Sequence, residues 1–329
     1  MSPARLILGL LLLAACGWVG LALFVAPETV AEIRPFTSSK QCQECHAQAF
    51  DEWESSWHAQ SWTDSEVRAL SDDFSNTDCI DCHAPRPIFE TGIGNRVLPR
   101  TTRRVEGVDC IACHLLPDGT MAGTLDNPSA ECRPVARREL LDPEFCAGCH
   151  DQHGTVKQWR ASRFAVEGPE FMDCIDCHMP LRDGTPAGGR DHTMHGGHDL
   201  ELVRAAVAMR AVRTSAGWSV EVENVGAGHN FPTDERSRAA DVFWRPLGAT
   251  SVDDWRRLHR FRNPYRFETG ETDTELPAGE TIGLPLEDPA AAEGAEVILV
   301  YKLSPYYEDA ERPDPEREAS VVHRLELRP

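Results

Sequence analysis

The sequence predicts an α+β fold, in which a region of short helices and long loops precedes a small antiparallel β-sandwich. Two observations predict it. Five Cys-x-x-Cys-His motifs crowd into residues 42–178, and from about residue 200 the motifs stop and apolar residues alternate in strand-length runs. We therefore expect an N-terminal membrane anchor or signal sequence over residues 1–30, a motif-bearing domain over 38–198 and a β-sandwich domain over 199–329.

The first thirty residues form an apolar segment. No charged residue occurs from Leu6 to Ala26, which is about the length that a helix needs to cross a bilayer. A cleaved signal peptide has a shorter apolar region, and Leu13-Ala14-Ala15-Cys16 resembles a lipoprotein signal. We favour an uncleaved inner-membrane anchor, with a lipoprotein or a secreted protein as alternatives. All three place the body of the chain on the periplasmic or extracellular side.

Cys-x-x-Cys-His is the attachment signature of c-type haem. Two thiols separated by two residues bond to the two vinyl groups of one porphyrin, and the adjacent histidine reaches its iron. Composition predicts only about 0.02 chance matches in the whole chain. The ten cysteines are Cys42, Cys45, Cys79, Cys82, Cys110, Cys113, Cys146, Cys149, Cys174 and Cys177, and the proximal histidines are His46, His83, His114, His150 and His178. The sequence therefore predicts five covalent haem c groups.

Other uses of these cysteines fit less well. A zinc site needs no histidine after every cysteine pair, and a redox dithiol would not recur five times. A disulfide framework leaves the five histidines unexplained. At roughly 27 residues per motif, the chain is too short to surround each porphyrin with an apolar core. The haems themselves must form much of the core, packed closely enough to conduct electrons.

The motif-bearing region contains an internal duplication. Trp53-x-x-Ser56-x-His58 follows the first motif, and Trp159-x-x-Ser162-x-Phe164 follows the fourth. Each is followed by Asp-Cys-Ile-Asp-Cys-His, at residues 78–83 and 173–178. We interpret this pattern as two haem pairs with the Cys110 motif as a bridge between them.

The C-terminal region reads as strands separated by Gly, Pro and Asp turns. The expected strands are Leu202–Val212, Trp218–Val225, Ala239–Trp244, Val297–Tyr301 and Val321–Leu327. Runs of this length and spacing are typical of a small antiparallel β-sandwich.

Eight histidines remain for the second axial position, which makes an iron six-coordinate and suited to electron transfer. His58 is the first candidate, and His229 stands in a turn-forming sequence beside Pro232. Three more lie in a cluster at spacing three, and one follows a proximal histidine by three residues. These four are His192, His195, His198 and His153. We expect His259 and His323 to be surface residues, and Cys132 has no assigned role.

The chain resembles the multihaem cytochromes c related to hydroxylamine oxidoreductase and to its tetrahaem electron acceptor, a cytochrome of the c-552/c-554 type. The resemblance covers residues 40–240. It rests on the first motif with its Trp53 repeat, and on three further segments: Gly107-Val108 before the third motif, Met179-Pro180 after the fifth, and Gly228-His229-Asn230-Phe231-Pro232-Thr233. It implies a haem-packed N-terminal domain, bis-histidine ligation and a periplasmic or extracellular redox role.

Three departures from that group matter. Phe164 replaces the histidine that the second repeat would offer. No Cys-x-x-Cys-Lys motif is present, so the lysine-ligated haem of related nitrite reductases is not expected. All four tyrosines lie beyond residue 260, which argues against a tyrosine-linked catalytic haem.

The function that we predict is electron relay through five haems, by a carrier rather than an enzyme. A reductase of nitrogen or sulfur oxyanions at a five-coordinate haem, and a filament-forming or scaffold haem protein, are the alternatives. The formal net charge of −20 argues against nucleic acid as a partner and suits docking onto a basic protein. We expect redox protein partners, such as a quinol-linked dehydrogenase or another cytochrome, and contact with the membrane through residues 1–30.

Overall fold

The computed structural model describes residues 35–233, 238–265, 268–303 and 320–329. The expected anchor or signal sequence, residues 1–30, lies outside the described residues. Within the described ranges, no helix has both the length and the apolar character needed to cross a membrane.

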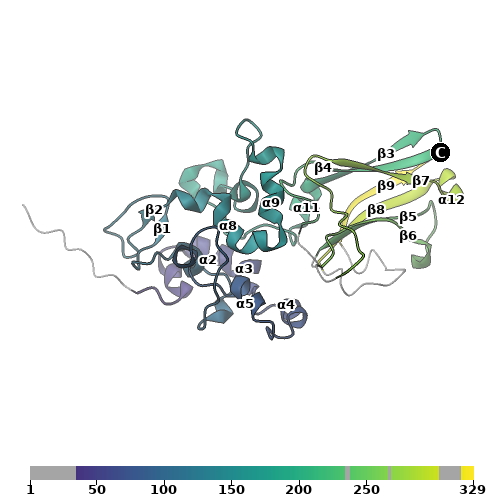
Figure 1. The fold of residues 1–329 in the computed structure, drawn as a ribbon. Coiled ribbons are helices and arrows are strands. Elements are labelled where there is room, and N and C mark those ends of the chain that lie inside the picture. Colours follow the sequence, from purple (N-terminus) through teal and green to yellow (C-terminus); the bar gives the residue numbers. More distant parts are fainter. Residues whose placement is uncertain (1–34, 234–237, 266–267, 304–319) are drawn as a thin grey trace, which may run out of the picture.

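The motif-bearing region folds into short helices joined by long loops, on the left of Figure 1. Its α-helices are α2 (Ala47–Glu54), α3 (Trp57–Gln60), α4 (Ser65–Leu70), α5 (Asp78–His83), α6 (Ile88–Thr91), α7 (Cys110–His114), α8 (Pro143–His150), α9 (Thr155–Arg160) and α10 (Cys174–His178). Its 3₁₀ helices are η1 (Ser39–Glu44), η2 (Arg104–Glu106), η3 (Arg138–Leu141), η4 (Asp151–His153), η5 (Arg163–Ala165), η6 (Arg182–Gly184) and η7 (Pro186–Gly188). A two-residue parallel pair, β1 (Ala122–Gly123) and β2 (Val135–Ala136), joins them.

Local capping, rather than a large core, starts these helices. The side chains of Asp109, Asp142 and Asp173 accept backbone N–H groups at the first turns of α7, α8 and α10. The apolar clusters of the region are small, one around Phe74 and one around Phe145. Such clusters agree with the expectation that side chains alone do not form the core here.

The second region is a β-sandwich of two antiparallel sheets, on the right of Figure 1. One sheet has the order β3-β4-β7 and the other β6-β5-β8-β9. The strands are β3 (Val207–Thr214), β4 (Gly217–Asn224), β5 (Ala239–Pro246), β6 (Arg256–Phe261), β7 (Thr281–Leu286), β8 (Ala295–Lys302) and β9 (Ser320–Leu327). Three short helices accompany them, namely α11 (Leu200–Ala206), η8 (Val252–Asp254) and α12 (Pro289–Ala292).

The sandwich core lies between the two sheets. Val220 and Val222 of one sheet belong to the same buried cluster as Val242, Val297 and Leu299 of the other. The central strands β5 and β8 are buried on both faces, since Phe243 and Ile298 pack in a second cluster on the outer face. This burial accounts for the near-continuous apolar runs of these two strands.

The predicted fold class is confirmed, and most of the predicted strands are present. The run Leu202–Val212 is split, because Asp199 caps a helix over its first half. Strands β6 and β7 were not expected. Three arginines obscure the alternation in β6 (Arg256, Arg257 and Arg260), and β7 contains Pro285 and Gly283. Their pairing with β5 and β4, rather than local propensity, makes them strands.

Candidate haem-binding site

Each Cys-x-x-Cys-His motif lies on a short helical turn. The second to fifth motifs end α5, α7, α8 and α10, and the first runs from η1 to the residue that precedes α2. One helical turn places residues three apart on one face, so the two cysteines of a motif share a face and the histidine follows next to them. None of the described cysteines is in a disulfide. This arrangement fits the predicted thioether attachment.

Thiols of different motifs are in contact. A hydrogen bond with Cys110, and then burial, raise the pKa of the Cys42 thiol. The thiols of Cys146 and Cys174 form a second hydrogen-bonded pair, and again the contact and then burial raise the pKa of Cys146. A third contact joins Cys82 and Cys149. The first motif therefore lies against the third, and the fourth lies against both the fifth and the second.

The indole contacts reveal the true repeat. Trp53 donates from Nε1 to the carbonyl oxygen of Val108 at 2.8 Å, two residues before the third motif. Trp159 donates to the carbonyl oxygen of Met172 at 2.9 Å, two residues before the fifth. The structural repeat thus pairs the first motif with the third and the fourth with the fifth. The predicted repeat, in which each Trp-x-x-Ser segment pairs with the hexapeptide that follows it, is wrong for the first copy, because Trp53 donates to the segment before the third motif and not to the one before residues 78–83.

Three pairs of histidines face each other across the gap that an iron would need. The ring centres of His58 and His150 lie 6.1 Å apart, those of His114 and His192 6.4 Å, and those of His178 and His229 6.3 Å. Two imidazole nitrogens that bind one metal ion from opposite sides, each at about 2.0 Å, put their ring centres roughly 6.3 Å apart. In each pair, one histidine ends a predicted attachment motif and the other is a predicted distal ligand.

Backbone carbonyls orient most of these rings. On the proximal side, His114 and His178 donate from Nδ1 to the carbonyl oxygens of Ala122 and His195, at 2.9 and 2.5 Å. On the distal side, His192 donates to Arg190 at 2.8 Å. His229 and the proximal His83 do the same, to Asn230 at 2.9 Å and to Ser61 at 2.8 Å. A histidine whose Nδ1–H is held in this way presents Nε2 to a metal.

Burial favours the neutral form, which is the form that binds a metal, in four of the paired histidines. It lowers the pKa of His58 to about 3 and that of His229 to about 4. Burial also lowers the pKa of His114 and of His192. The buried Nδ1 of His58 has no hydrogen-bond partner among the described residues. An unsatisfied buried nitrogen costs about 1–3 kcal/mol. A metal bound at this Nδ1, rather than at Nε2 as in the other histidines, would satisfy it, so His58 fits the role of axial ligand.

The remaining distal candidates differ from one another. His195 hydrogen-bonds Asp199 from Nδ1 at 2.7 Å, and Thr193 and Asp191 from Nε2 at 3.0 and 3.3 Å. Burial opposes its positive charge, but the hydrogen bonds that it donates to Asp199 and Asp191 outweigh burial and raise its pKa. Both nitrogens of His195 are engaged by side chains in the structure, and its predicted role as an axial ligand stays a prediction. Its backbone carbonyl orients His178.

Two further candidates lie in other surroundings. His198 stacks on the indole of Trp57, with ring centres 3.6 Å apart, and burial lowers its pKa to about 4. His153 is exposed and lines a cleft at the edge of the β-sandwich. Their predicted role as ligands stays a prediction.

The two histidines expected on the surface are in fact half-buried in the sandwich. His259 packs edge-on against Phe261, and His323 bonds from Nε2 to the carbonyl oxygen of Val207 at 2.6 Å.

The turn that carries His229 is anchored by Asn224, which the sequence did not single out, and by contacts with the second repeat. Asn224 is fully buried, and its Nδ2 donates to the carbonyl oxygens of His229 and Leu276, at 2.9 and 3.0 Å. Gly228 leaves room for the second repeat, since a Cβ there would lie 3.1 Å from Trp159 and 3.6 Å from Phe164. Phe164 therefore packs against this turn. No local sequence pattern signals these contacts, because their partners are far apart in the chain.

Glu52 anchors the backbone of His192 in a similar way. Its Oε2 accepts the backbone N–H of His192 at 3.0 Å, and its Oε1 accepts from Nε of Arg182 at 2.7 Å. The hydrogen bond from Arg182 lowers the pKa of Glu52. A carboxylate of helix α2 thus holds the backbone of His192, a predicted distal ligand that lies far along the chain.

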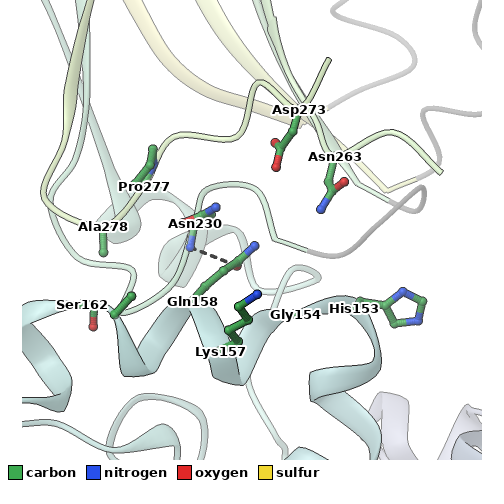
Figure 2. A pocket seen from close by; sticks show the side chains of 11 residues that line it. His153, Gly154, Lys157, Gln158, Ser162, Asn230, Asn263, Asp273, Pro277 and Ala278 are labelled. Carbon is green, nitrogen blue, oxygen red and sulfur yellow. Dashed lines mark hydrogen bonds between the residues drawn. The ribbon is translucent and has the colours of Figure 1, made fainter. Parts of the chain in front are cut away.

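A polar cleft of about 410 Å³ lies beside this anchored turn. Figure 2 shows Lys157 and Gln158 of α9 on one side, and Asn263, Asp273 and Asn230 on the other.

Comparisons with known proteins agree with this description. The family model described as cytochrome c554 and c-prime matches residues 41–115, which contain the first three motifs. The solved structure of a penta-heme cytochrome c552 from Thermochromatium tepidum matches with a TM-score of 0.60 and 19% identity, over 88% of this chain and 98% of that chain. At this identity the likeness shows the fold alone. A search of curated proteins found no match.

Proposed function

We propose that this multihaem c-type cytochrome carries five covalent haems and relays electrons outside the cytoplasm. The observation that carries the proposal is the set of three facing histidine pairs with ring centres 6.1–6.4 Å apart. Bis-histidine ligation makes haem iron six-coordinate and low-spin, a state suited to electron transfer rather than to substrate binding. The chain's own residues would then determine which irons have two histidine ligands, how far apart the haems lie and how well they are shielded from water.

The thiol contacts supply an order for the relay. The first attachment site adjoins the third, through Cys42 and Cys110. The third lies near the fourth, because Cys113 and Cys149 pack against the same buried cluster around Phe145. The fourth adjoins the fifth through Cys174, and the second through Cys82. We therefore propose a path from the first site through the third to the fourth, with branches to the fifth and the second.

We also propose where the relay works. The apolar segment over residues 1–30 would hold the protein at the outer face of the inner membrane, near a membrane donor such as a quinol-linked dehydrogenase. The net charge of −20 suits a basic redox protein as acceptor.

One observation favours a second candidate function, reduction of a small oxyanion. The ring of His46 is exposed and makes no ring contact within the described residues. An iron at the first site without a second protein ligand would be open to small molecules. A reversible redox titration, followed by an activity assay with small oxyanions, separates the two functions. Electron relay predicts uptake of five electrons per chain, with no turnover of nitrite, hydroxylamine or sulfite. Turnover coupled to reoxidation would favour the reductase.

A further inference from the structure

The axial pair formed by His178 and His229 joins the two halves of the molecule. His178 ends α10 in the motif-bearing region, whereas His229 follows strand β4 of the sandwich. Any loosening of the 229–233 turn from the helices would therefore draw one ligand away from the other. The contacts between that turn and α9 decide how firmly the pair is held.

Gln158 of α9 makes most of these contacts. Its Oε1 accepts the backbone N–H of Asn230 at 3.2 Å and the hydroxyl of Thr233 at 3.0 Å. Its Nε2 donates to Oε2 of Glu275 at 2.8 Å, and the same oxygen accepts Nδ2 of Asn230 at 3.1 Å. Figure 2 shows Gln158 rising from the helix to Asn230. One amide side chain thus binds both ends of the turn and its neighbouring loop.

The residue that Gln158 holds is the one that orients the ligand. The N–H of Asn230 bonds to Gln158, and the carbonyl oxygen of Asn230 accepts Nδ1–H of His229 at 2.9 Å. A shift of Asn230 would rotate the imidazole, because ring orientation follows the group that holds Nδ1. Thr155, on the same helix as Gln158, adds a hydrogen bond between its hydroxyl and that of Thr233 at 2.8 Å.

We propose that Gln158 is a positioning residue, which keeps His229 on the iron served by His178 by holding the 229–233 turn against α9. We call its hydrogen bonds to Asn230, Thr233 and Glu275 the clasp. This inference rests on the proposed function, since it takes His229 as an axial ligand. Gln158 itself would touch neither the iron nor the porphyrin. It acts through Asn230.

The test uses the mature, haem-loaded full-length protein and carbon monoxide as the probe of an open iron. Gln158→Met keeps the side-chain volume and removes the hydrogen bonds. The expected effect is that carbon monoxide binds the iron between His178 and His229, at a rate on the order of tenfold higher than in the wild type. A high-spin ferric signal should appear in the EPR spectrum, with haem content and circular dichroism unchanged.

Three comparison variants separate the explanations. Lys157→Ala alters the neighbouring, exposed residue of the same cleft and should behave as wild type. The double variant Gln158→Glu with Glu275→Gln exchanges the amide and the carboxylate. It can re-form the bond between positions 158 and 275, so it should restore the closed, low-spin state. His229→Ala should open the site completely.

The outcomes are distinct. If His229→Ala opens an iron but Gln158→Met does not, the clasp is refuted and the proposed function stands. If His229→Ala opens none, His229 is not a ligand and both fail. A double variant as open as Gln158→Met would also overturn the clasp, since the restored bond would then have no effect.

Discussion

The imidazoles of His178 and His229 face each other with ring centres 6.3 Å apart and planes only 10° from parallel. One belongs to an attachment motif and the other to the β-sandwich, so we propose that the sandwich supplies part of the redox site. On this proposal the sandwich is more than an added surface. The relationship also yields the first prediction.

His229→Ala should leave every haem covalently attached and convert one iron to high spin. The reason is that alanine offers no sixth ligand, while the thioether cysteines remain. EPR of the oxidised protein and carbon monoxide binding to the reduced protein measure the change. An unaltered spectrum, with no added carbon monoxide uptake, would show that the facing arrangement has no role in ligation.

His58→Ala should act in the same way on the iron served by His150, whose ring centre lies 6.1 Å from that of His58. Loss of the imidazole should also raise the potential of that haem. Spectroelectrochemical titration detects the shift. His323→Ala, in the sandwich, is the matched control and should leave all potentials in place. Equal titrations for the two variants would remove His58 from the ligand set.

Glu52→Gln tests the support of His192. The variant should lower the free energy of unfolding at neutral pH by about 1–2 kcal/mol, because a charge-assisted contact with Arg182 is weakened. The pKa of Glu52 is lowered in the folded state. Its stabilisation is therefore present above about pH 4.3, the unfolded value, and is lost as the pH falls through the folded pKa.

Denaturant unfolding at several pH values measures this difference, which should shrink below about pH 4. Glu90→Gln breaks an exposed pair with Arg86 and serves as control, with an expected change below about 0.5 kcal/mol. A gap between wild type and Glu52→Gln that persists at low pH would mean that packing, not charge, is responsible.

The mass of the denatured protein should equal the mature chain plus five haems, because five motifs are present. Intact mass spectrometry after maturation with a haem-ligation system gives the count. Replacing Cys110 and Cys113 with alanine should lower it by one. A wild-type count of four or fewer would contradict the stoichiometry.

The sequence was most informative where chemistry imposes a fixed local spacing. The motifs, and the strands β4, β5, β8 and β9, could be predicted because each depends on a short pattern. His195 could not be told from His192 by spacing, since the difference lies in the carboxylates of Asp191 and Asp199 around its ring.

Short sequence patterns could not predict the features that depend on long-range contacts. The identical hexapeptides at 78–83 and 173–178 suggested the wrong repeat, and only the indole contacts of Trp53 and Trp159 identified the true one. The clasp by Gln158 depends on a turn and a loop that are distant in the chain, so no window of sequence contains it.

If facing histidines make this chain an electron relay, the irons between them must be low-spin. The most direct measurement is spin quantitation by EPR of the fully oxidised, five-haem protein. We expect at least three low-spin ferric haems per chain, one for each of the pairs that contain His114, His150 and His178. Fewer than three low-spin haems in a protein of full haem content would contradict it.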